Sequence, residues 1–244
     1  MIVEVCCGSF EDANTAAKAG ANRIELNSAM FLGGLTPSLG NFRLCKNSMT
    51  IPVLPMIRPR SGGFLYSKME FEAMVLDAEI FLDSGADGIV YGFLHRDGTV
   101  DEERTKYFVK LAGKKDAVFH RAFDVVPDAS AALETLIDCG VTRVLTSGLA
   151  PSVYEGMDVI KALIKQANGR IEILPGAGLV ANNIKRFVDY TGVNQVHFAA
   201  TETRSEPSVS NNQRIYYGGA LYPREDLVEV TSLGGVAKII GSLT

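Results

Sequence analysis

Short runs of branched apolar residues alternate along the chain with longer amphipathic segments. Such alternation predicts parallel strands that are joined by helices through right-handed crossovers. The predicted strands lie near 2–7, 23–27, 52–58, 88–92, 117–121, 143–147, 171–175 and 195–199. Helices are expected between them, among others over 67–84, 128–139 and 231–241. The pattern therefore predicts an α/β protein.

One short pattern occurs four times, at 20–25, 85–90, 140–145 and 192–197. Each copy opens with a glycine that is expected to end a helix in the left-handed conformation and then enters an apolar run. The first glycines lie 65, 55 and 52 residues apart, a spacing that fits two strand–helix units. Four such pairs predict a closed (β/α)8 barrel of the TIM type, whose usual length is about 250 residues. A doubly wound open sheet is the competing architecture, but no glycine-rich dinucleotide turn follows the first strand.

The segment near 200–230 breaks this rhythm, because it is rich in Ser, Thr, Asn and Tyr and carries no helix pattern. A loop of this length inside a barrel is usually a lid, a contact surface or disordered. We interpret 1–244 as a single TIM-type barrel domain with a long loop near 200–230 after the last strand. That loop is expected to act as a lid or as an oligomer contact.

The repeats also predict which way side chains face, because side chains alternate along a strand. Four β-branched residues are expected to face the helices: Ile24, Ile89, Val144 and Val196. The alternate positions form one inner layer of the barrel: Glu25, Val90, Leu145 and His197. A buried carboxylate or imidazole without a partner is costly. Glu25 and His197 either pair with each other or with Arg58 in a structural network, or they are held at the mouth for a ligand.

Other polar residues fall at the carboxyl ends of the predicted strands, where barrel enzymes place their chemistry. The candidate acid–base residues are Glu4, Glu25, His120, Asp124 and His197. The candidate anion-binding residues are Arg58, Arg60, Ser147, Gly176 and Gly178. Loops after strands seven and eight often bind phosphate through backbone N–H groups, which is where the two glycines lie. The same residues could instead form ion pairs that keep the barrel closed.

Composition excludes several classes of partner. The net charge is −4 and no run of Lys or Arg occurs, so we expect neither nucleic acid nor anionic membranes to be bound. No apolar run has the length of a membrane span, and the N-terminus lacks the basic region of a signal peptide. The four cysteines suggest no disulfide framework. These features predict a cytoplasmic protein with reduced thiols.

Six motifs in order along the chain resemble the CutC family of copper homeostasis proteins. They lie at 23–26, 33–38, 56–60, 119–124, 143–148 and 175–178. The resemblance implies a TIM-like barrel in the cytoplasm, assembled as a homo-oligomer. It further implies a role in copper homeostasis and the binding of copper(I).

Copper(I) prefers thiolate and thioether ligands. Cys6 and Cys7 are adjacent on a strand, so only one can face the lumen, and Cys6 is the candidate metal ligand. The family carries a cysteine at the position of Asn27, so this chain lacks one thiol and its copper role is weakened. A copper site in the lumen would need Cys6 together with His120, His197 or a second subunit.

The alternative is an uncharacterised barrel enzyme that performs lyase or isomerase chemistry on a small anionic metabolite, for instance a phosphorylated one. Arg58 and the loop at 176–178 would hold the anion. Glu25 or His120 would act as the general base, with His197 or Glu4 as the acid. A non-catalytic sensor of a small molecule, built on the same pocket, is a third interpretation.

Overall fold

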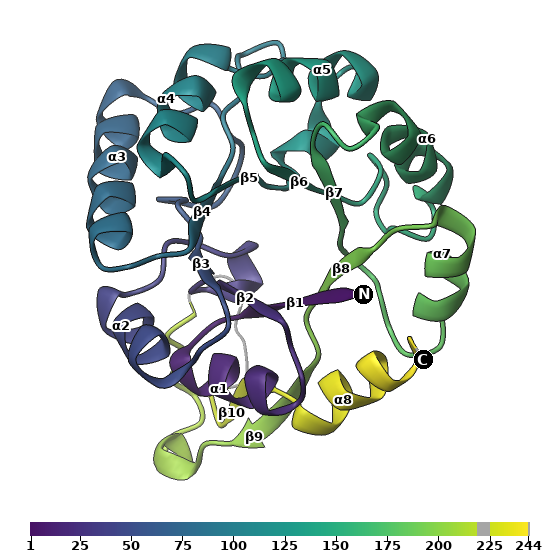
Figure 1. Ribbon diagram of the computed structural model, residues 1–244. Helices are drawn as coiled ribbons and strands as arrows, with labels where there is room; N and C mark the ends of the chain where they lie inside the picture. Colours follow the sequence, from purple (N-terminus) through teal and green to yellow (C-terminus); the bar gives the residue numbers. More distant parts are fainter. Residues whose placement is uncertain (219–224, 244) are drawn as a thin grey trace.

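The computed structural model describes residues 1–218 and 225–243 and confirms the (β/α)8 barrel (Figure 1). Parallel strands form an inner ring and helices surround it. The ring strands of the described residues are β1 (Ile2–Cys7), β2 (Arg23–Leu26), β3 (Val53–Pro55), β4 (Gly88–Tyr91), β5 (Asp116–Phe119), β6 (Arg143–Thr146), β7 (Glu172–Pro175) and β8 (Gln195–Phe198). The helices are α1 (Phe10–Lys18), α2 (Leu39–Ser48), α3 (Lys68–Asp83), α4 (Glu102–Ala112), α5 (Ala129–Cys139), α6 (Met157–Ala167), α7 (Ile184–Thr191) and α8 (Leu233–Gly241).

The ring closes because the first strand pairs with both the second and the last. Two runs of strands, β3-β2-β1-β8 and β4-β5-β6-β7, carry the regular parallel pairing. Single parallel bridges, Met56 to Val90 and Gly176 to His197, join the two runs. Closure leaves no free sheet edge, and it excludes the doubly wound alternative.

The helix ends follow the signals in the sequence. Ser67 caps α3 and forms a reciprocal capping box with Glu70, and Asp128 caps α5. The glycine that opens each repeat has a positive φ, for instance +82° at Gly140, the residue that ends α5. Left-handed glycines therefore turn the chain from a helix into the next strand, as the repeats predict.

The core has two layers, as the alternation of side chains predicts. One layer lies between the sheet and the helices and includes the four β-branched residues of the repeats: Ile24, Ile89, Val144 and Val196. The other is a small apolar cluster inside the ring, made of Leu54, Met56, Val90 and Val118. This cluster fills part of the interior of the barrel, as is usual for the fold, and a pocket opens toward the mouth.

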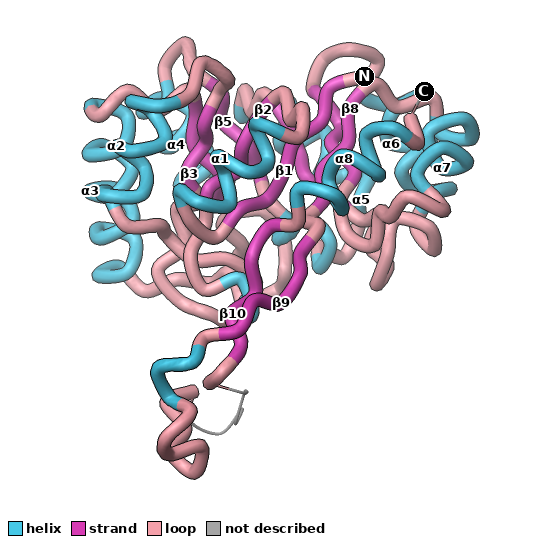
Figure 2. Tube along the Cα trace, turned by 90° about the horizontal axis from the view of Figure 1, so that it is seen from below, coloured by secondary structure: helices cyan, strands magenta, loops and turns pink. Residues whose placement is uncertain are grey.

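The segment near 200–230 is not a simple loop. Strands β9 (Thr201–Ser205) and β10 (Leu227–Thr231) form an antiparallel hairpin, with the 3-10 helix η3 (Pro207–Val209) following β9. Its base is tied to α1, where Arg204 pairs with Glu11. The hairpin extends beyond the barrel (Figure 2) and lies at its perimeter rather than across the ring in Figure 1. Because β9 is exposed along its whole length, its sequence lacks the apolar alternation that reveals a half-buried strand. Residues 219–224 of the predicted loop lie outside the described residues.

Within residues 1–218 and 225–243, we find no helix with both the length and the apolar character needed to cross a membrane.

Candidate functional site

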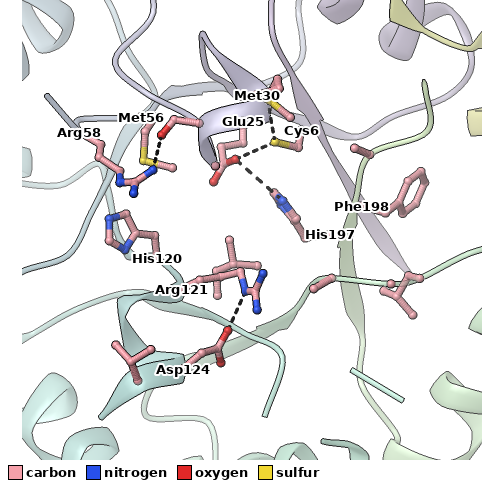
Figure 3. Close-up of a pocket in the computed structure, with 18 of the residues that line it drawn as sticks. Cys6, Glu25, Met30, Met56, Arg58, His120, Arg121, Asp124, His197 and Phe198 are labelled. Carbon is pink, nitrogen blue, oxygen red and sulfur yellow. Dashed lines mark hydrogen bonds and ion pairs between the residues drawn. The ribbon is translucent and has the colours of Figure 1, made fainter. Parts of the chain in front are cut away.

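A pocket of about 560 Å³ opens at the carboxyl ends of the strands. Charged and sulfur-containing side chains from several elements converge on it (Figure 3). The residues that line it most prominently are Cys6, Glu25, Met30, Met56, Arg58, His120, Arg121, Asp124, His197 and Phe198. Its position is the one at which barrels of this type hold their ligands.

His197 lies between two carboxylates at this mouth. It stands beside Glu4 in the register of β8 and β1, and its Nδ1 lies 2.7 Å from Glu4 Oε1. Its Nε2 lies 3.8 Å from Glu25 Oε2. Glu4 is also paired with Arg23, on the side away from the pocket lining. A carboxylate that holds one imidazole nitrogen fixes the ring and leaves the other nitrogen to face a ligand.

The protonation of this group follows from its charges. Burial by itself would lower the pKa of His197, but the charge of Glu25 and the hydrogen bond and charge of Glu4 outweigh it and raise that pKa. Burial would raise the pKa of Glu4, but the hydrogen bond to His197 and the charge of Arg23 lower it to about 2. Glu4 is therefore ionised and favours the protonated form of His197.

Glu25 is satisfied at one carboxylate oxygen only. Its Oε2 accepts hydrogen bonds from the Cys6 thiol, at 3.2 Å, and from Asn27 Nδ2, at 2.8 Å. Its Oε1 is buried and has no hydrogen-bond partner. The side chain points into the pocket in Figure 3. A buried carboxylate oxygen without a donor costs stability, so a group that supplies a donor or a cation would bind there favourably.

Two sulfur atoms lie together beside Glu25. The Sγ of Cys6 is 3.8 Å from the Sδ of Met30, which belongs to the 3-10 helix η1 (Met30–Leu32). Gly8 permits this approach, because a Cβ at that position would lie 3.1 Å from Met30 Cγ. Burial and the neighbouring Glu25 raise the pKa of Cys6 well above its ordinary value, so the free site holds a neutral thiol.

Cys6, Glu25 and His197 together form a group that could hold a metal ion, because one ligand atom from each lies within 4.8 Å of the others. Cys7 faces the opposite side of β1 and is part of the core, as the alternation predicts. Cys45 and Cys139 are buried core residues on α2 and α5. Cys6 is the cysteine that lines the pocket.

Across the pocket lie His120 and Arg58. The backbone N–H of Ala122 donates to His120 Nδ1 at 3.1 Å, while His120 Nε2 has no partner. Burial and the positive charge of Arg58 lower the pKa of His120 to about 3. Arg58 donates to the backbone carbonyls of Leu32 and Gly34, both at 3.0 Å, and so holds the loop before α2. Arg58 takes no part in the network of Glu25 and His197.

Asp124 lines the pocket but its carboxylate is fully engaged. It accepts hydrogen bonds from Thr146 Oγ1 at 2.6 Å and from the N–H of Ser147 at 2.9 Å. Arg121 Nε donates to its other oxygen at 2.7 Å. These contacts tie the 3-10 helix η2 (Arg121–Val125) to the loop after β6. The carboxylate has little capacity left for a substrate proton.

The predicted anion-binding residues are divided by the structure. Arg58 and Gly178 line the pocket, whereas Arg60 pairs with Glu70 outside it. Ser147 supports Asp124 and Arg121 from behind the lining. Gly176 makes room for its neighbours, because a Cβ there would lie 2.7 Å from Leu145 Cδ1 and 2.9 Å from His197 Cδ2.

Met30 and Arg121 line the pocket but are not among the residues that the sequence predicts for it. Arg121 lies in the motif at 119–124, directly after His120, and this position was the available signal. Met30 lies between β2 and α2 in a segment without periodicity, so alternation could not place it. The available signal for Met30 was its position in the sequence, a thioether shortly after the strand that carries Glu25.

A family model described as the CutC family matches residues 1–202. A protein of Treponema denticola, named as a CutC family protein, is 55% identical over 241 residues, which cover 99% of this chain and 98% of the relative. The human relative, named "Copper homeostasis protein cutC homolog", is 42% identical over 245 residues, which cover 98% of this chain and 90% of the relative.

Solved structures agree with the fold. The crystal structure of CutC from Streptococcus agalactiae is 33% identical and superimposes with a TM-score of 0.77, covering 81% of this chain and 98% of that chain. Phosphoribosylanthranilate isomerase from Thermotoga maritima has a TM-score of 0.57 at 12% identity, covering 100% of this chain and 98% of that one. The second likeness concerns the barrel fold alone.

Proposed function

The chain belongs to the CutC family, and from that premise we propose that its pocket binds copper(I) through Cys6, Met30 and His197. The observation that carries this proposal is the 3.8 Å approach of Cys6 Sγ and Met30 Sδ next to the imidazole of His197. A thiolate, a thioether and an imidazole are ligands that suit copper(I). The human relative's name associates that protein with copper homeostasis.

The resemblance implies a cysteine at position 27, where this chain has Asn27, and in the proposed site Met30 supplies a second sulfur. The Nδ2 group of Asn27 lies 3.3 Å from Cys6 Sγ, so the amide occupies the place beside the thiol without being a soft ligand. Met30 approaches Cys6 from a different segment and supplies the second sulfur. The proposed site therefore has two sulfur ligands, which suit copper(I) better than Cys6 as the single sulfur ligand would.

Binding would displace protons. The Cys6 thiol must ionise to become a ligand, and its pKa is raised by burial and by Glu25. His197 must present a neutral Nε2 to the ion. The two carboxylates beside His197, Glu4 and Glu25, would then balance the positive charge of the metal. The group is thus suited to exchange protons for a monovalent cation.

An anaerobic competition titration of copper(I) against a strong chelator tests the proposal. Cys6→Ser should weaken copper(I) binding by more than the roughly 10- to 100-fold that loss of an outer partner costs. Met30→Leu, which keeps the shape of the side chain and removes its sulfur, should weaken binding by about tenfold.

Matched variants serve as controls for this titration. Cys139→Ser removes a buried thiol in α5, and Met69→Leu removes an exposed thioether in α3. Both should bind copper(I) as the wild type does. Equal affinity of Cys6→Ser and the wild type would overturn the proposal.

A second candidate function is acid–base catalysis on a small metabolite. It is favoured by the carboxylate–imidazole–carboxylate series of Glu4, His197 and Glu25, in which Glu4 orients a ring whose far nitrogen faces the pocket. His197 would then act as the acid and Glu25 as the base. Turnover of a candidate substrate that is lost in both His197→Gln and Glu25→Gln, in copper-free protein, would support this function. Turnover retained in either variant would contradict it.

Cytoplasmic location and assembly into a homo-oligomer are proposals that rest on the family resemblance alone. Analytical ultracentrifugation of the full chain tests the second. Sedimentation as a single-chain species at micromolar concentration would contradict it.

A further inference from the structure

One wall of the pocket presents a hydrogen-bond donor that no residue uses. His120 is 3% exposed, and its Nδ1 is taken by the N–H of Ala122. The low pKa of about 3, caused by burial and by Arg58, keeps the ring neutral at physiological pH. With Nδ1 acting as the acceptor, the proton must reside on Nε2, which has no partner. A buried imidazole N–H of this kind requires an acceptor.

The same wall carries a positive charge without a balancing acid. Among residues 1–218 and 225–243, no carboxylate lies within ion-pair distance of Arg58. Its guanidinium donates hydrogen bonds to three neutral backbone carbonyls, those of Leu32, Gly34 and Gly62. Arg121, which also lines the pocket, is by contrast neutralised by Asp124. This wall therefore carries one positive charge without a counter-ion, on Arg58, beside the neutral N–H donor of His120.

Glu25 has the reverse need, because its Oε1 is a buried acceptor without a donor. Figure 3 shows Glu25 on one side of the cavity with Arg58 and His120 on another. The lining also includes the apolar side chains of Leu145 and Leu179. The pocket thus offers a positive charge and an N–H donor from Arg58 and His120, an acceptor without a donor at Glu25, and apolar surface elsewhere in its lining.

We propose that this pocket binds a small carboxylic acid that also carries a hydroxyl or amino group and an apolar body. The carboxylate would lie against Arg58 and accept a hydrogen bond from His120 Nε2. The hydroxyl or amino group would donate to Glu25 Oε1. A single unmatched positive charge fits a monoanion better than a doubly charged phosphate ester. This site uses Arg58 and His120, which take no part in the proposed copper site, and it does not depend on copper.

Isothermal titration of copper-free protein with matched probes tests the proposal. The first pair is 3-phenyllactate and 3-phenylpropionate, which differ only in the hydroxyl group. We expect 3-phenyllactate to bind about tenfold more tightly, the effect of one hydrogen bond to a charged group. Glycerol 3-phosphate, offered as the phosphate alternative, should bind more weakly than 3-phenyllactate.

Two variants test which residues bind the hydroxyl and the carboxylate of the probe. Glu25→Gln should abolish the preference for 3-phenyllactate over 3-phenylpropionate. The amide N–H group of the glutamine would face the ligand hydroxyl, so the hydroxyl would lose the carboxylate that accepts its hydrogen bond. His120→Phe, which keeps an aromatic ring against Phe64 and Phe119, should weaken both carboxylates about tenfold. The controls Glu72→Gln and His95→Phe alter exposed side chains outside this pocket and should change neither affinity.

The proposal would be overturned if neither probe bound, if the two bound equally well, or if glycerol 3-phosphate bound most tightly. If His120→Phe fails to fold, the relative affinity of Glu25→Gln for the two probes still tests whether Glu25 binds the hydroxyl group. Binding of 3-phenyllactate is measured in copper-free protein, and copper(I) binding is measured in the separate competition titration, so either proposal can fail without the other.

Discussion

Glu25 and Asp124 are two carboxylates in the lining of one pocket, and their surroundings differ. Asp124, in the turn after β5, accepts hydrogen bonds at both oxygens from Thr146, Ser147 and Arg121. Glu25, on β2, uses one oxygen for Cys6 and Asn27 and leaves the other buried and unpartnered. Glu25 lies on a strand and Asp124 in the turn after one, and the sequence predicts both as acid–base residues.

The difference indicates which carboxylate holds the structure together and which is reserved for a ligand. A buried acceptor with all its donors in place stabilises the fold, and removing it leaves those donors unsatisfied. A buried acceptor without a donor costs free energy in the unliganded protein, and such cost is typical of functional sites. On this basis we expect the Glu25 carboxylate of the β1–β2–β8 wall to serve a ligand, and the Asp124 carboxylate to hold the turn after β5 and the loop after β6 in place.

The largest effect is expected for Asp124→Ala. The substitution leaves the Thr146 hydroxyl and the Ser147 N–H without their acceptor, which should lower the free energy of unfolding by roughly 3 kcal/mol. Urea unfolding measures this loss. Asp189→Ala, an exposed aspartate on α7, is the control and should stay within about 0.5 kcal/mol of the wild type. A small loss in Asp124→Ala would show that Asp124 does not support the structure.

A smaller effect is expected for Gly176→Ala. The new Cβ would lie 2.7 Å from Leu145 Cδ1 and 2.9 Å from His197 Cδ2, so the imidazole must shift. We expect a loss of about 1 kcal/mol in the free energy of unfolding, together with weaker copper(I) binding. Gly63→Ala is the control, because Gly63, like Gly176, has no positive φ, and nothing lies within 4 Å of a Cβ built there. Unchanged copper(I) affinity in Gly176→Ala would contradict the placement of His197 at the ion.

The pH dependence of stability tests the carboxylate–imidazole group. Because the folded pKa of His197 is raised, its stabilisation is complete below its unfolded value of 6.5 and is lost as the pH rises through the folded value. The folded pKa of Glu4 is lowered to about 2, so its stabilisation is complete above 4.5 and is lost as the pH falls toward 2. The difference in unfolding free energy between the wild type and His197→Gln should therefore be largest between about pH 4.5 and 6.5. A difference that grows from pH 6.5 to 9 would contradict the raised pKa of His197.

The smallest change in stability is expected for Glu25→Gln. Its unpartnered oxygen contributes no hydrogen bond, so the free energy of unfolding should change by less than about 1 kcal/mol. The change can be an increase or a decrease, because replacing a buried charge is in some cases stabilising. Thermal unfolding of Glu25→Gln and Asp124→Ala side by side measures the contrast directly. Equal destabilisation of the two variants would break the comparison.

The sequence predicts the barrel well because its strands are buried on both faces. Their apolar runs and the left-handed glycines, such as Gly140, mark each strand–helix junction. Alternation also places Cys6, Glu25 and His197 in the lumen, since a strand leaves only two directions for a side chain. These residues meet because neighbouring strands are in register, Cys6 opposite Glu25 and Glu4 opposite His197.

Alternation fails where the chain leaves the strands. Arg60 shares its parity with Arg58, but β3 ends at Pro55 and the following loop carries Arg60 outward to Glu70. Met30 reaches Cys6 only through the turn of η1 and the close approach to Gly8, neither of which a period reveals. The engagement of Asp124 likewise depends on the loop after β6, which is distant in sequence.

X-ray absorption at the copper edge of copper(I)-loaded protein tests the central claim most directly. The claim is that the β1–β2–β8 wall holds the ion through Cys6, Met30 and His197. The wild type should show two sulfur ligands and one nitrogen, Met30→Leu should lose one sulfur, and Cys139→Ser should match the wild type. A spectrum without sulfur ligands, or one that is unchanged in both Cys6→Ser and Met30→Leu, would contradict the account.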